Sequence, residues 1–486
     1  MARLNVQTLA QLPDSVKKPA YNLKTTGCGI VHIGPGAFHR AHQAVYTDLA
    51  MAHGGDWRIQ AVSMRSRDLQ EKLTEQDNLY ALAVLDHQPY TQIVGALKSV
   101  FVLATDRAAI MEALGNANTH IITLTITEKG YCLNNQGELD TSHPDIRHDL
   151  EFVQEPVSAI GLLVAALSQR KKKAHCELTI ISCDNLSDNG TKLGAAVKAF
   201  ASLLDANLAD WIEQNICFPN TMVDSITPAT DNDLIIRTET EIGVHDAWPI
   251  QREAFSQWVI EDKFSGPRPA WEKVGVTFTD DVHIFEKAKL RILNGTHSTL
   301  AYIGSLCGLD TVYAAINEPA LEQFIRRLLT KEILPTIDAG DKLDVSAYAD
   351  EIIQRYHNPH IRHMLAQIAW DGSQKLPFRI LNTIRDRVTA KGAISHLCAP
   401  VAAWILFIAQ RQQSGEKLTD PNADKLLKLA AEHQHDVTDF ADAILNLQDV
   451  FAELSDNRQF RDTVHAQLAT LKKLDKSNPA DCLGAL

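Results

Sequence analysis

The sequence predicts an α/β fold in which a doubly wound parallel sheet precedes a mostly α-helical domain. Over residues 1–283, short β-branched and apolar runs alternate with stretches of helical periodicity, which is typical of parallel strands joined by crossover helices. Over residues 284–486, helical patterns interrupted by prolines dominate and little strand signal remains. Because 486 residues exceed the usual size of one domain, we expect two, with the boundary between residues 280 and 285.

The predicted elements of the first domain alternate in the order that such a sheet requires. A polar arm over residues 1–25 comes first. Strands are expected over residues 29–33, 57–64, 78–85, 92–103, 120–127 and 177–183. Helices are expected after the first strand through residue 50, and over residues 69–75, 108–117, 157–171 and 190–204. Ligands of open α/β sheets bind at the carboxyl ends of the strands, so the loops there are the first candidates for a site.

Composition narrows the class of protein. The formal net charge is −13 at pH 7. This charge argues against a surface that binds nucleic acid or anionic lipid, because such a surface needs a basic patch. The eight cysteines form no Cys-x-x-Cys pair, the start of the chain lacks the apolar region of a signal peptide, and no apolar run has the length of a membrane span. We therefore expect a cytoplasmic protein with reduced thiols and with neither a nucleic-acid nor a membrane partner.

A pair of glycines follows the first predicted strand and opens a helix, which is the geometry of a dinucleotide-binding turn. Gly34 and Gly36 let the backbone turn tightly and approach a pyrophosphate, and the helix that begins with Ala37 and Phe38 offers its amides and its positive dipole end. The third glycine of the common fingerprint is absent. The position of the pair between a strand and a helix nevertheless predicts a Rossmann-type domain.

An acid that would hold the adenosine ribose is expected near the end of the second strand. Asp68 is the candidate, although it lies further from the glycines than is usual. Arg67 stands beside it, and an arginine there can accommodate the 2′-phosphate of NADP. We expect NAD as the cofactor, with NADP as the alternative. Glu128 and Lys129, in the loop after the strand at 120–127, are further candidates, and an ordinary turn is the alternative for that loop.

A lysine, a carboxamide and an imidazole share one face of the helix predicted at the start of the second domain. On a helix that advances ~100° per residue, Asn294 lies ~140° and His297 ~80° round from Lys289. Such a group can take up a proton and stabilise a negative oxygen. The alternative is that these polar residues are solvated or cap the helix.

Histidines and cations further along the chain raise two other hypotheses. His357, His360 and His363 recur at intervals of three, but Pro359 interrupts them and carboxylates are scarce, so surface or capping roles are expected and no metal site. Arg362, Lys375 and Arg379 concentrate positive charge around the turn that begins at Asp371. That charge would suit an anionic substrate.

Several motifs in order along the chain resemble the mannitol dehydrogenase family of long-chain, metal-independent polyol and hexuronate dehydrogenases. The matching segments are Gly34-x-Gly36-Ala37-Phe38-His39-Arg40-Ala41-His42-Gln43, Thr127-Glu128-Lys129-Gly130-Tyr131, Ser182-Cys183-Asp184-Asn185, Thr221-Met222-Val223-Asp224, Gln257-Trp258-Val259-Ile260-Glu261-Asp262 and Lys289-x-x-x-Leu293-Asn294-Gly295-x-His297. They cover about the first 380 residues, and the last hundred residues carry little that matches.

The resemblance implies a reaction and a role for each residue of the site. It implies a Rossmann-type domain, a mostly helical second domain and an active site in the cleft between them, without a metal. Lys289 would be the general acid/base, because a lysine whose pKa is lowered can take the hydroxyl proton while hydride leaves for NAD. The remaining implied roles are oxygen binding by Asn185 and Asn294, hydroxyl positioning by His297, lining of the site by Asp224 and Lys375, and proton exchange with solvent by Glu286.

The substrate is either a sugar acid or a neutral polyol. Segments 245–249 and 269–275 resemble mannitol 2-dehydrogenases, whereas Lys289-Leu290-Arg291, Arg362-His363 and the stretch from Gln367 to Arg379 resemble enzymes of fructuronate and mannonate. The second set also supplies guanidinium groups, which bind carboxylates bidentately. We therefore favour D-fructuronate and D-mannonate, with mannitol or arabinitol 2-dehydrogenase activity as the alternative. Ser225 stands where the family usually has arginine, and the family leans towards monomers.

Two other classes of protein predict different behaviour. A regulatory protein without chemistry would bind NADH but oxidise none with any ketose or keto acid. A metallohydrolase built on His357 and its neighbours would lose its activity on chelation. Together, Lys289, Asn294, His297 and Asn185 favour the dehydrogenase.

Overall fold

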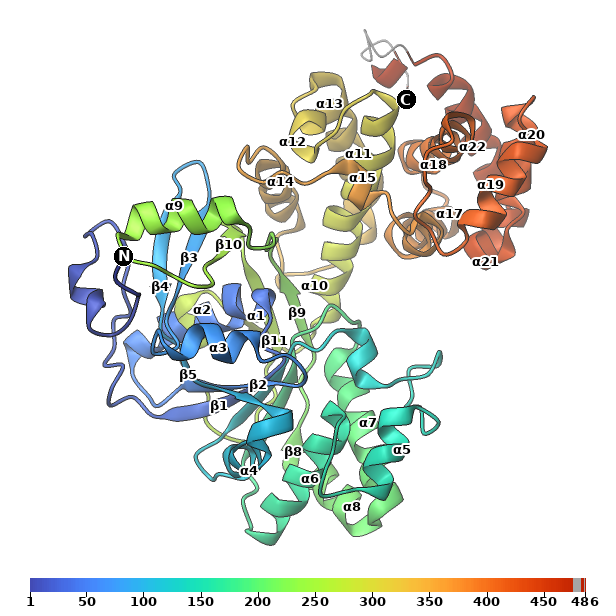
Figure 1. Ribbon diagram of the computed structural model, residues 1–486. Helices are drawn as coiled ribbons and strands as arrows, with labels where there is room; N and C mark the ends of the chain where they lie inside the picture. Colours follow the sequence, from blue (N-terminus) through green and yellow to red (C-terminus); the bar gives the residue numbers. More distant parts are fainter. Residues whose placement is uncertain (475–481, 485) are drawn as a thin grey trace. The chain divides into compact units, whose positions relative to one another are not determined.

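The computed structural model describes residues 1–474, 482–484 and 486, and the chain divides into two compact units, Met1–Val282 and His283–Leu486. The first unit is built around a parallel sheet with helices on its faces, and the second is built from helices (Figure 1). The predicted fold class is confirmed. None of the helices in the described part of the chain combines the length and the apolarity that a membrane span needs.

The central sheet of the first unit has parallel strands in the order β5-β2-β1-β6-β7-β8. Its strands are β1 (Cys28–Ile33), β2 (Arg58–Ser63), β5 (Leu97–Val102), β6 (Ile121–Leu124), β7 (Leu178–Ser182) and β8 (Ile216–Cys217). The chain moves outward from β1 to β5 and then returns to the other side of β1 with β6. The strand order therefore reverses between β1 and β6, which is the switch point where ligands of this fold bind.

Alternate residues of these strands supply two separate cores. Val31 and Ile33 of β1 face one core with α4 (Leu103–Leu114), α5 (Pro144–Glu151), α6 (Ala159–Lys172), α7 (Asn189–Leu204) and α8 (Ala206–Asn215). Ile30 faces the other, with α1 (Ala37–Ala41), α2 (Gln43–Ala50) and α3 (Asp68–Thr74). Figure 1 shows α4–α8 gathered on one side of the sheet. Burial on both faces explains why the strands are nearly continuous apolar runs.

Two smaller sheets complete the first unit. One has the order β10-β3-β4, and the other has the order β12-β11-β9. Their strands are β3 (Tyr80–Leu85), β4 (Tyr90–Val94), β9 (Thr221–Asp224), β10 (Ile250–Glu253), β11 (Gln257–Glu261) and β12 (Thr277–Thr279). The amphipathic helix α9 (Asn232–Ile242) lies between β9 and β10 in the chain. β9 pairs antiparallel with β11, and this pairing fixes Asp224 opposite Gln257.

The strand predicted over residues 92–103 is wrong as a single element. The run divides at Gly95 into β4 and β5, which belong to different sheets. The amide of Gly95 donates to Oδ1 of Asp48 at 2.8 Å, and a Cβ on Gly95 would lie 2.5 Å from Cδ2 of Leu23. A close contact with the N-terminal segment therefore requires glycine where the chain changes sheet.

The polar arm predicted over residues 1–25 is packed against the first unit. Leu4, Leu12 and Val16 are buried together with Ile93 and Ile242, and the short 3₁₀ turn Thr8–Gln11 lies among them. These apolar side chains are widely spaced among polar residues, which hid their burial from the pattern of the sequence.

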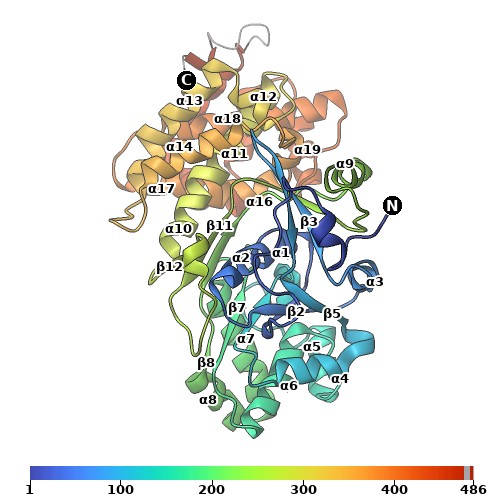
Figure 2. The same cartoon turned by 90° about the vertical axis from the view of Figure 1, so that its left-hand side faces the viewer.

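The second unit is a set of helices around α11 (Gly295–Leu306) and α18 (Ser395–Ser414), which pack against each other (Figure 2). Its other helices are α10 (His283–Ala288), α12 (Val312–Ile316), α13 (Pro319–Leu328), α14 (Val345–Tyr356), α15 (Leu365–Ile368), α16 (Gly372–Leu376), α17 (Asn382–Thr389), α19 (Ala423–Glu432), α20 (Val437–Leu445), α21 (Gln448–Phe451) and α22 (Arg458–Leu471). The C-terminal helix α22 packs along α18.

Three segments in the described part of the second unit are π-helical, where a regular α-helix was predicted. They are η5 (Lys289–Asn294), η6 (Leu329–Ile333) and η8 (Pro377–Leu381). Both η6 and η8 contact η5. π-Helical turns are rare and are frequently found at functional sites, and η5 contains two of the residues predicted to be catalytic.

Candidate active site

The turn after β1 has room for a dinucleotide. Gly34 has φ 88°, and a Cβ there would lie 2.3 Å from the carbonyl oxygen of Thr125. Gly36 precedes α1, and the nearest atom to a Cβ built on it is 4.0 Å away. The first glycine therefore lets β1 and β6 approach closely, and the second leaves open space in front of the helix. Both features fit the pyrophosphate of NAD.

A buried histidine ties this turn to the neighbouring strand. The ring of His32 bonds Oγ1 of Thr123 at 2.7 Å and Oγ1 of Thr125 at 3.0 Å, and Thr125 donates in turn to the carbonyl of Gly34 at 2.7 Å. Burial lowers the pKa of His32 to about 3. The imidazole is therefore neutral and serves as a fixed hydrogen-bonding group at the switch point.

A cavity of about 600 Å³ opens at the carboxyl ends of β1, β2 and β6, within the first unit. Its lining residues are Gly34, Ser63, Met64, Arg65, Ser66, Ile126, Thr127, Lys129, Gly130, Cys132, His143, Asp145, Val157, Ser158 and Ala159. Of the predicted cofactor residues, Gly34 and Lys129 are among them.

Other predicted cofactor residues lie outside the set that lines this cavity. Arg67 and Asp68 are exposed at the start of α3, and the carboxylate of Asp68 accepts a bond from Oγ of Ser66 at 2.8 Å. Arg65 and Ser66, the two residues before Arg67, line the cavity instead. Sequence reasoning missed them because it looked for an acid and not for the residues that directly follow β2.

The loop after β7 is held by Asp184. Its carboxylate accepts the amides of Ile126 at 3.0 Å and Thr127 at 2.9 Å and the hydroxyl of Tyr131 at 2.6 Å. Burial raises the pKa of Asp184, and these hydrogen bonds act in the opposite direction. The next residue, Asn185, is exposed. Asp184 thus fixes the position from which the predicted catalytic amide projects.

The same loop is connected to the strand that ends at Asp224. The side chain of Asn189 donates to the carbonyls of Asp184 at 3.1 Å and Thr221 at 3.0 Å. Asp224, at the end of β9, is 7 % exposed. Asn185 and Asp224 therefore belong to neighbouring, mutually bonded segments of the first unit.

The predicted catalytic residues of the second unit lie on two consecutive helical segments. Lys289 is 9 % exposed and begins η5, Asn294 ends it, and His297 lies in the first turn of α11. Glu286 is on α10 one turn before Lys289, with His283 3.4 Å from its carboxylate.

His297 is surrounded by aromatic and positively charged groups. Its ring centroid is 4.8 Å from that of Tyr356 and 5.1 Å from that of His363. Burial is the main cause that holds the pKa of His297 well below its ordinary value, and His363, Arg355 and Arg379 add to the effect. Burial and the same two arginines lower the pKa of His363 to about 4. Both imidazoles are therefore neutral near pH 7, in a region of positive potential.

One of the three predicted substrate cations, Arg379, contributes to that potential, and a second, Lys375, lies near Arg379. Arg379 lies on η8, and its Nη1 donates to Oγ of Ser298 at 3.2 Å. Lys375 is on α16, with its Nζ 3.7 Å from the carboxylate of Asp371. Burial lowers the pKa of Lys375, and the charge of Arg379 lowers it further. The third cation, Arg362, is exposed.

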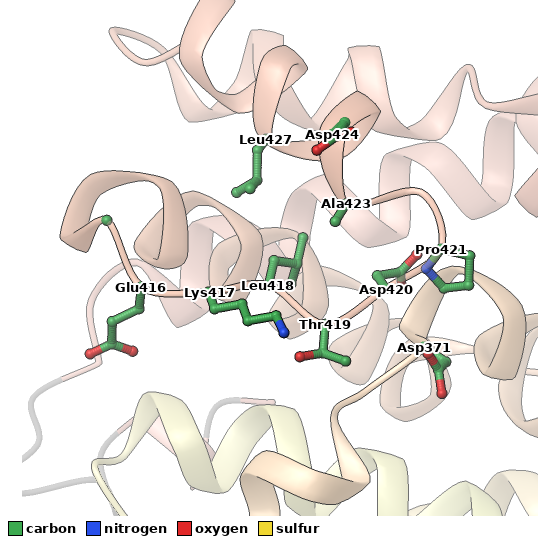
Figure 3. A pocket seen from close by; sticks show the side chains of 11 residues that line it. Asp371, Glu416, Lys417, Leu418, Thr419, Asp420, Pro421, Ala423, Asp424 and Leu427 are labelled. Atoms are coloured by element: carbon green, nitrogen blue, oxygen red, sulfur yellow. The ribbon is translucent and has the colours of Figure 1, made fainter.

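The segment that carries Lys375 is fixed by a loop from elsewhere in the second unit. Oδ2 of Asp420 accepts the amide of Ser373 at 2.8 Å, and Oδ1 accepts its hydroxyl at 2.5 Å. The amide of Asp371 donates to the carbonyl of Thr419 at 2.9 Å. Figure 3 shows Asp371, Thr419 and Asp420 together at one end of a pocket of about 650 Å³. Sequence reasoning missed Asp420 because no local motif marks it.

The three histidines considered for a metal have different neighbours. His357 contacts Asn317 at 3.3 Å and Glu322 at 3.8 Å, His363 packs against His297, and His360 is exposed. Among the described residues, the group able to hold a metal ion lies in the first unit instead and consists of Cys132, His143 and Asp145. No motif in the sequence indicates this group, because the three residues follow no known ligand spacing.

Comparison with known protein families covers most of the chain. A family model described as the Mannitol dehydrogenase Rossmann domain matches residues 28–273, and one described as the Mannitol dehydrogenase C-terminal domain matches residues 281–472. The two matches meet close to the division between the structural units.

Individual relatives are similar over nearly their whole length. The D-mannonate oxidoreductase of Escherichia coli is 39% identical over 97% of this chain and 98% of its own. The mannitol 2-dehydrogenase of Cereibacter sphaeroides is 37% identical over 91% of this chain and 93% of its own. Among solved structures, the ternary complex of Pseudomonas fluorescens mannitol 2-dehydrogenase with NAD and D-mannitol matches with a TM-score of 0.81, 35% identity and 99% coverage of both chains.

Proposed function

The chain belongs to the mannitol dehydrogenase family, whose members are oxidoreductases that act on secondary alcohols with NAD, and on this premise we propose that it interconverts D-fructuronate and D-mannonate. The observation that carries this choice of substrate is the positive charge around His297, which Arg379 and Arg355 supply, with Lys375 close enough to Arg379 for their charges to interact. A neutral polyol offers no counter-charge to such a cluster, whereas the carboxylate of a sugar acid does.

Lys289 is the proposed general acid/base. In the direction of oxidation its Nζ takes the proton of the carbinol hydroxyl, and in the direction of reduction it returns that proton. Bound NAD supplies the hydride acceptor. Glu286, one turn earlier on α10, is the proposed carboxylate through which the proton exchanges with solvent. A general base typically contributes about 10²- to 10⁴-fold to the rate.

Amide groups are the proposed partners of the reacting oxygen. Asn294 in the second unit and Asn185 in the first have side-chain N–H groups that can donate to a carbonyl that gains negative charge. His297 is neutral, so it can both donate and accept a hydrogen bond and can thus orient a substrate hydroxyl. Asp224 is the proposed acceptor for another substrate hydroxyl. These groups require no metal to stabilise the oxygen.

The carboxylate of the substrate is assigned to Arg379 and Lys375, with Arg362 as an outer contact. Arg379 donates a hydrogen bond to the neutral hydroxyl of Ser298 and lies on a segment that contacts η5. Asp371, 3.7 Å from Lys375, is 41 % exposed at its side chain, so water screens this ion pair. A second anion could therefore approach the lysine.

The proposed dinucleotide site is the cavity at the ends of β1, β2 and β6. Gly34, Gly36 and the start of α1, with Ala37 and Phe38, are assigned to the pyrophosphate. Lys129, which lines the cavity, and its neighbour Glu128 are assigned to other parts of the dinucleotide. NAD is the expected cofactor. Arg67, next to Asp68, could accommodate the 2′-phosphate of NADP, so NADP is the alternative cofactor. The ratio of kcat/KM for NADH and NADPH distinguishes the two.

Oxidation assays test the proposed substrate. D-Mannonate, D-mannitol and D-arabinitol are offered separately with NAD, and the formation of NADH is followed. We expect D-mannonate to be oxidised with the highest kcat/KM. A higher value for D-mannitol or D-arabinitol would assign the chain to the polyol 2-dehydrogenases and make the arginines structural.

A further inference from the structure

We propose that Cys132, His143 and Asp145 form a binding site for a thiophilic divalent cation, with Zn²⁺ as the best fit. One ligand atom from each residue lies within 4.8 Å of the other two. A thiol, an imidazole and a carboxylate are the ligand set that zinc accepts, whereas Mg²⁺ and Ca²⁺ prefer oxygen ligands alone. This site takes no part in the hydride transfer proposed above.

The donor atoms are close to the separation that a tetrahedral zinc ion requires. With Zn–S of about 2.3 Å and Zn–N or Zn–O of about 2.0 Å, neighbouring ligand atoms lie about 3.5 Å apart. The ligand atoms therefore have to approach one another by at most about 1.3 Å, which side-chain rotation can supply. All three residues also line the cavity at the ends of β1, β2 and β6. The fourth position of the ion would consequently face the cavity and hold water or a ligand.

The backbone brings the three residues together without the ion. Cys132 is buried in the left-handed conformation, with φ 52°, at the end of the 3₁₀ turn Glu128–Tyr131. The amide of Asp140 donates to the carbonyl of Cys132 at 2.8 Å, which closes the intervening loop. His143 is the N-cap of α5, and Asp145 lies in its first turn. The site is thus preorganised by a closed loop and a helix start.

The electrostatic surroundings favour a cation. Three carboxylates, those of Asp145, Asp149 and Asp140, lie close enough to Cys132 to place negative charge around the group. Arg65 is the opposing charge, but its side chain is 91% exposed and its ion pair with Asp145 is 3.9 Å long.

The imidazole of His143 can bind the ion through Nε2 if it gives up the hydrogen bond by which it caps α5. Nδ1 of His143 accepts the amide of Asp145 at 3.2 Å, which requires the ring proton on Nε2. Coordination through Nε2 moves that proton to Nδ1 and gives up the cap. Asparagine is an equally good N-cap, so His143→Asn removes the ligand and keeps the helix start.

Direct metal binding by the full-length protein tests the site. After treatment with a chelator, the protein is titrated with Zn²⁺ by calorimetry and with Co²⁺ by absorbance, where a thiolate ligand produces a charge-transfer band in the near ultraviolet. We expect one equivalent of Zn²⁺ and a Co²⁺ band. Cys132→Ser should abolish the band and weaken Zn²⁺ binding by at least about tenfold, and His143→Asn should weaken it comparably.

Cys176→Ser is the matched control, because Cys176 is a half-buried thiol of the same unit that lies outside the group. It should leave stoichiometry, affinity and band unchanged, and thermal unfolding checks that each variant is folded. Binding that survives in Cys132→Ser and His143→Asn, or the absence of binding in the unaltered chain, would overturn the site.

Zn²⁺ and the dinucleotide should compete if both bind in the same cavity. This expectation rests on the proposed function, which assigns the dinucleotide to that cavity. Zn²⁺ should then weaken NADH binding, and NADH should weaken Zn²⁺ binding by the same factor. Metal bound at Cys132 with no effect on NADH affinity would overturn the shared cavity but keep the metal site. Loss of metal binding alone would leave the dehydrogenase proposal untouched.

Discussion

Lys289 and Asn294 are the first and last residues of one π-helical segment. Hydrogen bonds in a π-helix join residues five apart, so the turn is wider than in an α-helix. The two residues therefore lie closer round the helix axis than the ~140° that regular helical spacing gives. For a base and an amide that are proposed to act on the same oxygen, this wider turn is a better arrangement than the predicted one.

Replacement of the proposed base should abolish chemistry and spare cofactor binding. We expect Lys289→Ala to lower kcat by about 10²- to 10⁴-fold, because no other group of η5 can take the proton. NADH affinity, measured by fluorescence titration, should stay within twofold. Lys287→Ala is the control, since Lys287 is two residues away and pairs with Asp386. Comparable activity of the two variants would remove Lys289 from the mechanism.

Removal of the guanidinium of Arg379 should affect a sugar acid more than a polyol. A hydrogen bond to a charged group contributes about 1.5–3 kcal/mol, so Arg379→Gln should lower kcat/KM for D-fructuronate by about 10- to 100-fold. Activity with D-fructose should change much less. Arg385→Gln is the matched control, because Arg385 pairs with Glu453 instead. Equal losses with both substrates would make Arg379 a structural residue.

Asp420 should affect catalysis through the position of Lys375. Asp420→Ala removes both acceptors of Ser373 and loosens the start of α16, so we expect KM for the sugar acid to rise by about tenfold while kcat falls little. Asp424→Ala, on an exposed residue of the same pocket (Figure 3), should leave both constants unchanged. A variant in which kcat falls and KM is constant would contradict a positioning role.

Acid should destabilise the second unit through His363. Its pKa is about 4 in the folded chain against an ordinary 6.5, so between these values the unfolded chain binds more protons than the folded one. The free energy of unfolding must then fall as the pH falls from 6.5 to 4. Denaturant unfolding at several pH values should show a shallower dependence for His363→Asn. His435→Asn, on an exposed histidine, should behave like the unaltered chain.

The fold class followed from the sequence because its signals are local and repeated. Apolar strands alternate with helical patterns along the first unit, and the glycines at 34 and 36 mark the turn after β1. Those features depend on neighbours in the chain. The division at Gly95 depends instead on Leu23 and Asp48, and the burial of Leu4 depends on a cluster that includes Ile242. Contacts between residues so far apart in the chain produce no periodic pattern in the sequence.

The site was predictable only where residue type and spacing carry the chemistry. Lys289, Asn294 and His297 stand in one short stretch, so their association could be inferred, whereas the π-turn between them could not. The supporting groups are distant in sequence from the residues that they bond. Asp184 accepts amides 57 and 58 residues away, and Asp420 accepts an amide 47 residues away. The group of Cys132, His143 and Asp145 is assembled by a loop closure and a helix cap, for which no motif exists.

The most direct test of the proposed substrate is NADH consumption by chelator-treated protein with D-fructuronate and D-fructose, compared as kcat/KM. The positive charge around His297 predicts a strong preference for D-fructuronate, lost in Arg379→Gln. A preference for D-fructose in the unaltered chain would contradict the carboxylate-binding role of that charge and identify a polyol dehydrogenase.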